Sequence, residues 1–162
     1  MEMVRRLAPL IAVFVLSAIV AGCGSGGGSA ATPSACLGSV NSYLGALRDA
    51  PGPVRLGGDT AISDCFSDAQ GSGEFADVGQ TVIKAATQLN ATARQDGGGE
   101  AAVELGYLDG AVRKGARNTA ATAVDLVRRL ESAARFTPGG ESPGAAFERA
   151  YGKGYAAGES SG

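Results

Sequence analysis

The 162-residue sequence contains no histidine and no tryptophan, and only 6% of its residues are aromatic. Without histidine there is no imidazole general base, no serine–histidine–aspartate triad and no histidine-ligated metal site. Carboxylates and lysines also catalyse reactions, so the commonest catalytic arrangements are excluded but enzymes as a class are not. The shortage of large rings predicts a core of thin, closely packed elements rich in alanine.

Signals for strands, redox pairs and phosphate loops are missing too. No stretch alternates apolar and polar residues as a half-buried strand does, and no internal repeat is visible. No C-x-x-C pair occurs, and the glycines of the C-terminal half do not follow a strand as those of a phosphate-binding loop would. The sequence therefore predicts an all-α protein and indicates no cofactor and no metal.

The one long apolar run lies at the N-terminus. Arg5 and Arg6 precede residues 7–20, which have the length of a signal-peptide hydrophobic region and fall short of the ~20 residues that a spanning helix needs. A membrane helix or an ordinary signal peptide is the simpler reading. The run ends, however, in Val-Ala-Gly-Cys at Cys23, an aliphatic residue and two small residues before a cysteine.

This ending resembles the lipobox of bacterial lipoproteins. The resemblance implies that residues 1–22 are a signal peptide cleaved before Cys23, and that Cys23 carries a thioether-linked diacylglycerol and often an acylated amino group. Residues 23–35 then form the lipidated cysteine and a flexible Gly/Ser tether with a reach of about 20 Å. We expect the protein at the extracytoplasmic face of the cell membrane, held there by its lipid.

The charge of the chain is slightly acidic. The formal net charge is −2, and it becomes −3 once Glu2, Arg5 and Arg6 are removed with the signal peptide. An acidic balance disfavours nucleic acid as a partner, as does an exported location. The expected partners are the membrane, through the lipid on Cys23, and a protein of the cell envelope.

Cys36 and Cys65 remain after Cys23 is assigned to lipid. Two cysteines in an oxidising compartment most simply pair with each other. A bridge that closes roughly 30 residues stabilises a fold by about 3–4 kcal/mol in the chain-entropy model. A metal or redox pair is the alternative, but it lacks histidine and C-x-x-C spacing, so we predict a Cys36–Cys65 disulfide.

Helices are predicted where apolar residues recur at spacings of three and four. Proline and glycine mark the breaks: Pro51-Gly52-Pro53 ends the first helix and three glycines at 97–99 end a later one. The expected helices cover residues 37–50, 60–69, 71–96, 100–136 and 145–157, and residues 159–162 are expected to fray. We group residues 36–136 as a small disulfide-stapled bundle of about four helices, and residues 137–162 as a loop and a short C-terminal helix.

The apolar stripes of these helices predict the core. The stripe of the longest helix passes Gly106, Gly110 and Gly115. Each of these glycines costs a helix up to ~1 kcal/mol, which makes sense if another backbone approaches there, or if the helix bends or breaks. The stripes of the two earliest helices are Leu37, Val40, Leu44 and Leu47, followed by Ile62, Cys65 and Phe66.

Three clusters of charged residues are candidates for a metal, catalytic or anion-binding site. Asp59, Asp64 and Asp68 could bind calcium, but their spacing is no EF-hand loop and capping is the preferred interpretation. Glu100 and Glu104 lie one turn apart, and complementation of the helix dipole explains them better than paired catalysis. Arg113, Lys114 and Arg117 could meet an anionic headgroup or an acidic partner, and a solvated helix face is preferred.

Phe147, Tyr151 and Tyr155 share one face of the last predicted helix. In so aromatic-poor a chain, they must either dock on the bundle or bind a partner. We expect docking and keep the three residues as candidates for partner binding.

The leading functional hypothesis is a noncatalytic interaction or binding module at the cell envelope. The alternative is a carrier of a small ligand or lipid with an apolar pocket between helices, and an envelope enzyme is third. The lipobox and the Gly/Ala/Arg-rich composition resemble small uncharacterised lipoproteins of high-GC Gram-positive bacteria, and no activity follows from that resemblance.

Overall fold

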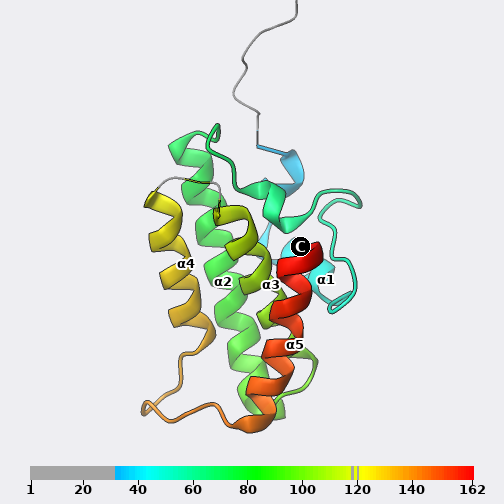
Figure 1. Ribbon diagram of the computed structural model, residues 1–162, viewed down its shortest axis with the longest axis vertical. Coiled ribbons are helices and arrows are strands. Elements are labelled where there is room, and N and C mark those ends of the chain that lie inside the picture. Colours follow the sequence, from blue (N-terminus) through cyan, green and yellow to red (C-terminus); the bar gives the residue numbers. More distant parts are fainter. Residues whose placement is uncertain (1–31, 118, 120) are drawn as a thin grey trace, which may run out of the picture.

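The computed structural model describes residues 32–162, apart from residues 118 and 120 (Figure 1). The predicted signal peptide, Cys23 and most of the predicted tether lie outside the described residues. The part that is described is all-α, with an isolated bridge between Leu56 and Thr60 and no strand. Its elements are two 3-10 helices, η1 (Ser34–Leu37) and η2 (Ile62–Cys65), and the helices α1 (Val40–Leu47), α2 (Ser72–Asp96), α3 (Glu100–Ala116), α4 (Ala121–Ala134) and α5 (Ala145–Ser161).

Four helices, α2 to α5, form a bundle around α3 (Figure 1). Successive helices run in opposite directions, so that α3 and α5 run parallel to each other. α3 contacts α1, α2, α4, α5 and η2, and it is buried on nearly every side between Leu105 and Val112. None of the described helices is both long and apolar enough to cross a bilayer.

The turn between α2 and α3 follows the sequence prediction. α2 ends at Asp96, and Gly97 adopts a left-handed conformation with φ +66°, which glycine accepts without strain. The carboxylate of Asp96 then accepts the N–H of Gly99, at 3.2 Å, where α3 begins. The three glycines therefore reverse the chain between two packed antiparallel helices.

The prediction of a single helix over residues 100–136 is wrong, because α3 and α4 are separate helices. The break does not fall at the glycines. It follows Ala116, whose carbonyl oxygen accepts both the N–H and the hydroxyl of Thr119, at 3.2 and 3.0 Å. A threonine side chain that bonds to a nearby carbonyl competes with the helical ladder, and the chain turns into α4 at this point.

The first helix is shorter than predicted. Ser39 caps α1 by accepting the N–H of Ser42, and the residues before it form η1 instead. Leu37 is 49% exposed, so its predicted place in the stripe is wrong, and Tyr43 is buried instead. η1 also begins at Ser34, within the segment that was expected to be tether.

The segment between α1 and α2 is a folded loop. The short helix expected over residues 60–69 is only the 3-10 turn η2, although Ile62, Cys65 and Phe66 face the core as predicted. Val54 and Leu56, in the segment expected to be loop, are buried as well. Glycine is needed where η2 meets α3, because a Cβ at Gly115 would collide with the carbonyl oxygen of Ser63.

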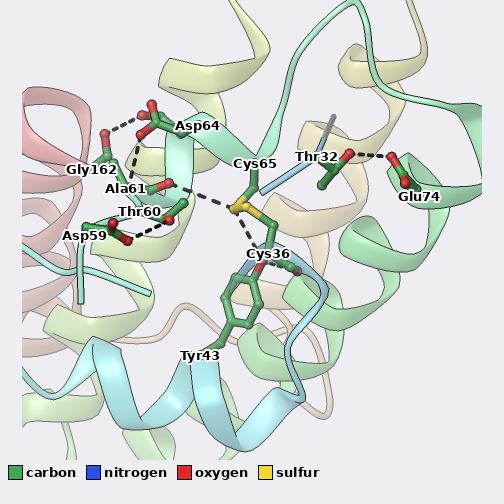
Figure 2. The surroundings of a disulfide bond; sticks show 11 residues. Thr32, Cys36, Tyr43, Asp59, Thr60, Ala61, Asp64, Cys65, Glu74 and Gly162 are labelled. Carbon is green, nitrogen blue, oxygen red and sulfur yellow. Dashed lines mark hydrogen bonds between the residues drawn. A yellow bond between two sulfur atoms is a disulfide. The ribbon is translucent and has the colours of Figure 1, made fainter. Parts of the chain in front are cut away.

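The Cys36–Cys65 disulfide is present, with the two Cα atoms 5.4 Å apart (Figure 2). It joins η1 to η2, and both cysteines are buried. The Tyr43 ring lies beside the bridge, and its hydroxyl donates to the carbonyl oxygen of Cys36 at 2.9 Å. The bridge thereby fixes the start of the described chain to the bundle.

The end of α5 is ordered, so the prediction that residues 159–162 fray is wrong. Donors on other elements satisfy its last carbonyl groups, which an isolated helix end would leave unpaired. Arg55 donates to the oxygen of Ser161 at 3.0 Å, and Ser63 donates to the oxygen of Gly162 at 2.6 Å. Sequence spacing could not reveal these partners, which lie about 100 positions earlier in the chain.

α3 and α5 pack backbone against backbone through glycines one turn apart. A Cβ at Gly106 or Gly110 of α3 would collide with the backbone at Tyr151 or Tyr155, and one at Gly154 or Gly158 of α5 would collide with that at Val103 or Tyr107. The expectation that another backbone approaches the α3 glycines is confirmed for Gly106 and Gly110, which α5 approaches, and for Gly115, which the carbonyl oxygen of Ser63 approaches. The matching pair on α5 was not recognised in the sequence.

Candidate functional site: a charged cleft between α3, α4 and α5

A cleft of about 300 Å³ lies where α3, the end of α4 and α5 meet. α3 supplies Asp109 and, one turn later, Arg113. The last turn of α4 and the residue after it supply an acid and a base, and α5 supplies an acid and two rings. The lining residues are Asp109, Arg113, Glu131, Arg135, Glu148, Tyr151, Gly152 and Tyr155.

Asp109 is the buried centre of this cleft. It lies on the stretch of α3 that is covered on nearly every side, and its side chain is only 2% exposed. The hydroxyl of Tyr151 donates to Oδ2 of Asp109. Within the described part of the chain, Oδ1 has no hydrogen-bond partner. A buried carboxylate oxygen without a donor is costly and therefore marks a candidate site for a ligand or water.

Four of the charges around Asp109 form two ion pairs. Arg113 pairs with Glu131 and thereby links α3 to α4. Arg135, just after α4, pairs with Glu148 of α5 at 3.1 Å. The same guanidinium groups lie near aromatic rings, with Arg135 5.0 Å from the ring centre of Tyr151 and Arg113 5.8 Å from that of Tyr155.

Burial is the main influence on the pKa values of Asp109 and Tyr151. It raises the pKa of Asp109, although the Tyr151 hydrogen bond and the charges of Arg113 and Arg135 act to lower it. Burial also raises the pKa of Tyr151, and the neighbouring Asp109 raises it further. Tyr151 therefore stays a hydrogen-bond donor, and Asp109 holds its proton to a higher pH than an exposed aspartate. A shifted carboxyl in a cleft is a functional-site candidate on physical grounds.

The three aromatic residues of the last helix divide between the core and the cleft. Phe147 is 1% exposed and Tyr151 4%, so both dock on the bundle as expected. Tyr155 is only partly buried, lies at the edge of the cleft and donates to Glu159 at 3.3 Å. The rings of Phe147, Tyr151 and Tyr155 stack in succession, with centres 5.7 and 6.3 Å apart.

The basic residues of α3 do not form a free solvated face. Arg113 pairs with Glu131 and Arg117 pairs with Glu159 of α5. Lys114 donates to the carbonyl oxygen of Ser160 at 3.1 Å. The three side chains bridge neighbouring helices and remain partly exposed, so the face is in contact with solvent and also links α3 to α4 and α5.

Asp59 and Asp64, the candidates for calcium binding, make local hydrogen bonds instead. Asp64 accepts the N–H of Ala61 at the start of η2, and Asp59 accepts the hydroxyl of Thr60. Burial, followed by repulsion from Glu100, raises the pKa of Glu104. Over the described residues, no three acidic or cysteine side chains converge to hold a metal ion.

A second hollow, of about 610 Å³, lies between the first half of α2 and α4. Its apolar part includes Phe75, Gly79 and Leu126, and its rim carries Asp125 and Arg129. A Cβ at Gly79 would lie 3.2 Å from a methyl carbon of Leu126, so glycine sets how closely the two helices approach. This hollow is the larger of the two, and polar side chains such as Ser67, Gln70 and Gln80 also line it.

Sequence reasoning did not identify Asp109 as the centre of a site. A signal was present: Asp109 follows Leu105 by four residues and precedes Val112 by three, so it shares the face of two core residues. Glu131, Arg135 and Glu148 carried no comparable signal, because their convergence depends on how α4 and α5 pack. No family model matches the chain, and neither a curated protein nor a solved structure matches it.

Proposed function

We propose that the protein is a lipid-anchored lipoprotein of the cell envelope, and that its helical domain is a noncatalytic binding module. The lipobox ending at Cys23 and the Gly/Ser-rich segment after it support the anchor. The Cys36–Cys65 disulfide fits the oxidising side of a membrane. The observation that carries the binding role is the cleft at Asp109, where three helices hold charged groups in fixed places around an unpartnered carboxylate oxygen.

The anchor predicts the fate of a Cys23→Ser variant. Because serine has no thiol to form the thioether, we expect an unlipidated precursor that keeps residues 1–22, lacks the mass of a diacylglycerol group and differs from wild type in its membrane retention. Intact mass of the mature wild-type protein should exceed the polypeptide mass by a diacylglycerol group. An unmodified Cys23 in mature wild type would overturn the proposal of an anchor.

The binding role is tested by site-specific photo-crosslinking in the native envelope. A crosslinking residue at Gly152, exposed on the rim of the cleft, should capture a partner reproducibly. The matched control is Gly45 of α1, which is exposed and, like Gly152, has open space for a side chain. Equal capture from both positions, or none from Gly152, would contradict a binding module that uses this cleft.

The hollow between α2 and α4 favours a second candidate, a carrier of a small apolar ligand. Phe75 and Leu126 line it, and its volume of about 610 Å³ is within the range of small-molecule sites. Native mass spectrometry of protein taken gently from the envelope should then show a bound apolar molecule. Leu126→Gln should lose that molecule while the Asp109 cleft is unaffected, and its retention would exclude this hollow as the site.

A further inference from the structure

We propose that the cleft between α3, α4 and α5 binds a primary ammonium group, whose N–H bonds are accepted by Oδ1 of Asp109. This inference rests on the proposed binding function and names the chemistry that the cleft recognises. The side chain of Asp109 lines the cleft, is 2% exposed, and has no partner for Oδ1 among the described residues. A donor carried by a ligand removes the cost of that unpaired oxygen.

The charge balance of the cleft selects a cation. Arg113 and Arg135 are each paired with a glutamate of the lining, so these four charges cancel. The charge left over is the negative charge of Asp109. An anion finds a donor in Nε of Arg113, which is buried without a hydrogen-bond partner among the described residues, but it would lie beside the carboxylate of Asp109 and be repelled by it, whereas a cation is attracted there.

The rings and the donor requirement select the kind of cation. Guanidinium groups already lie near Tyr151 and Tyr155, at 5.0 and 5.8 Å, so a quaternary ammonium finds these rings occupied. It also has no N–H bond to give to Asp109. A divalent metal ion needs several oxygen ligands, and the described residues bring no three acidic side chains together. A primary ammonium carries three N–H donors, of which Oδ1 of Asp109 accepts one while the glutamate carboxylates of the lining or water accept the others. A cleft of about 300 Å³ holds the end of a lysine side chain or a small amine.

Three small probes test the proposal in wild-type protein by NMR titration at neutral pH. n-Butylammonium should shift the backbone amides of residues 109–113 and 148–155 in a saturable way. Tetramethylammonium has the charge without the N–H donors, and butyrate has the opposite charge, so neither should produce saturable shifts there. Equal binding of tetramethylammonium or butyrate at these residues, or no saturable shift with butylammonium, would overturn the inference.

Asp109→Asn tests the carboxylate directly. It preserves the shape of the side chain and removes the charge, so butylammonium binding should weaken by at least about tenfold. Glu141→Gln, on the exposed loop before α5, removes the same charge elsewhere and should bind as wild type does. Unchanged affinity in Asp109→Asn would refute the role of Asp109, and if that variant does not fold, the three-probe comparison in wild type still decides.

A lysine side chain and a free amine are two sources of the same group. Nα-acetyl-lysine-N-methylamide that binds more tightly than butylammonium supports a lysine of a partner protein, and the reverse order supports a small amine. Photo-crosslinking from Gly152 is independent of these titrations. Selective capture there, together with no response to butylammonium, would overturn the ammonium inference and leave the binding module standing.

Discussion

Each of the four tyrosines combines an apolar body with a hydroxyl that is placed on a specific polar partner. In a chain without tryptophan, these side chains supply much of the large apolar volume available to the core. The hydroxyls of Tyr107 and Tyr151 also link segments that are distant in sequence, because a buried O–H needs a partner. The partners are the carbonyl of Cys36 for Tyr43, the N–H of Val54 for Tyr107, the carboxylate of Asp109 for Tyr151 and that of Glu159 for Tyr155.

Tyr151→Ala is expected to destabilise the fold by about 2–4 kcal/mol, because it leaves a cavity between α3 and α5 and deprives Asp109 of its donor. Tyr151→Phe removes the hydroxyl alone and should cost about 1.5–3 kcal/mol, as for a hydrogen bond to a charged group. Chemical denaturation of the three proteins measures both differences. An unchanged melting temperature in Tyr151→Ala would show that this ring is not part of the core.

Asp109→Asn is expected to raise the melting temperature at neutral pH. Burial raises the pKa of Asp109, so near and above the ordinary range of an aspartate the native state binds more protons than the unfolded chain. The stability of the wild type therefore falls as pH rises through this window and stays lower above the folded pKa. Asparagine carries no charge and escapes this penalty.

Thermal unfolding over a pH series measures this effect. The stability of Asp109→Asn relative to wild type should rise with pH above about 3, where both states of the wild type are protonated, and should level off above the folded pKa of Asp109. The other charges near Asp109, on Arg113, Arg135 and Glu159, are the same in both proteins and cancel in the comparison. A variant less stable than wild type at pH 7 would mean that the Tyr151 hydrogen bond outweighs burial.

Among the helix pairs, α3 and α5 depend most on glycines, because these residues have no Cβ at the contact. Glycines four residues apart on both helices let the two backbones meet directly, so that each Cα lies over a carbonyl of the other helix. Such close approach gains dispersion contacts and weak Cα–H···O interactions along the interface. These gains offset the low helix propensity of glycine, and α5 remains helical through Ser161 despite its three internal glycines.

Gly154→Ala tests this interface. Its Cβ would collide with the carbonyl oxygen of Val103, and overpacking of this kind typically costs 1–3 kcal/mol, more than the gain in helix propensity. Gly152→Ala on the same helix meets nothing within 4 Å and should stabilise by about 0.5–1 kcal/mol. Urea denaturation should give opposite signs for the two variants, and equal effects would argue against backbone contact between α3 and α5.

For the whole domain, the disulfide secures the end nearest the predicted tether. η1 begins within the last two residues of that segment, and Thr32 also donates to Glu74 at the start of α2, at 2.6 Å (Figure 2). The bridge ties η1 to η2, which contacts α3, and η1 itself contacts α2, so this end of the domain is held by two helices of the bundle.

Removing the bridge in a Cys36→Ala, Cys65→Ala double variant should lower the free energy of unfolding by about 3–4 kcal/mol. The cysteines are separated by 29 positions, and the bridge restricts the unfolded chain over that length. Reduction of the wild type with a thiol should give a loss of similar size when followed by denaturation. A loss below about 1 kcal/mol in both experiments would show that the packing around Tyr43 holds the two segments without the bridge.

Local signals were sufficient for the helical class, the disulfide, the extent of α2 and the turn at residues 97–99. Glycine and proline end a helix through their effect on the adjacent backbone, and two cysteines without other partners form a disulfide with each other. The inward face of η2 and the docking of Phe147 and Tyr151 also followed from periodicity alone, because an apolar stripe must be covered by something.

The remaining features depended on groups far apart in the chain. α5 reaches Ser161 because Arg55 and Ser63 satisfy its end, and α3 continues through its glycines because α5 lies against them. The cleft exists because parallel packing of α3 and α5 brings Tyr151 to Asp109 while the end of α4 adds its charges. Helix periodicity determines which face of a helix is apolar, but the neighbour that covers this face, and the charges it brings, are determined by long-range packing.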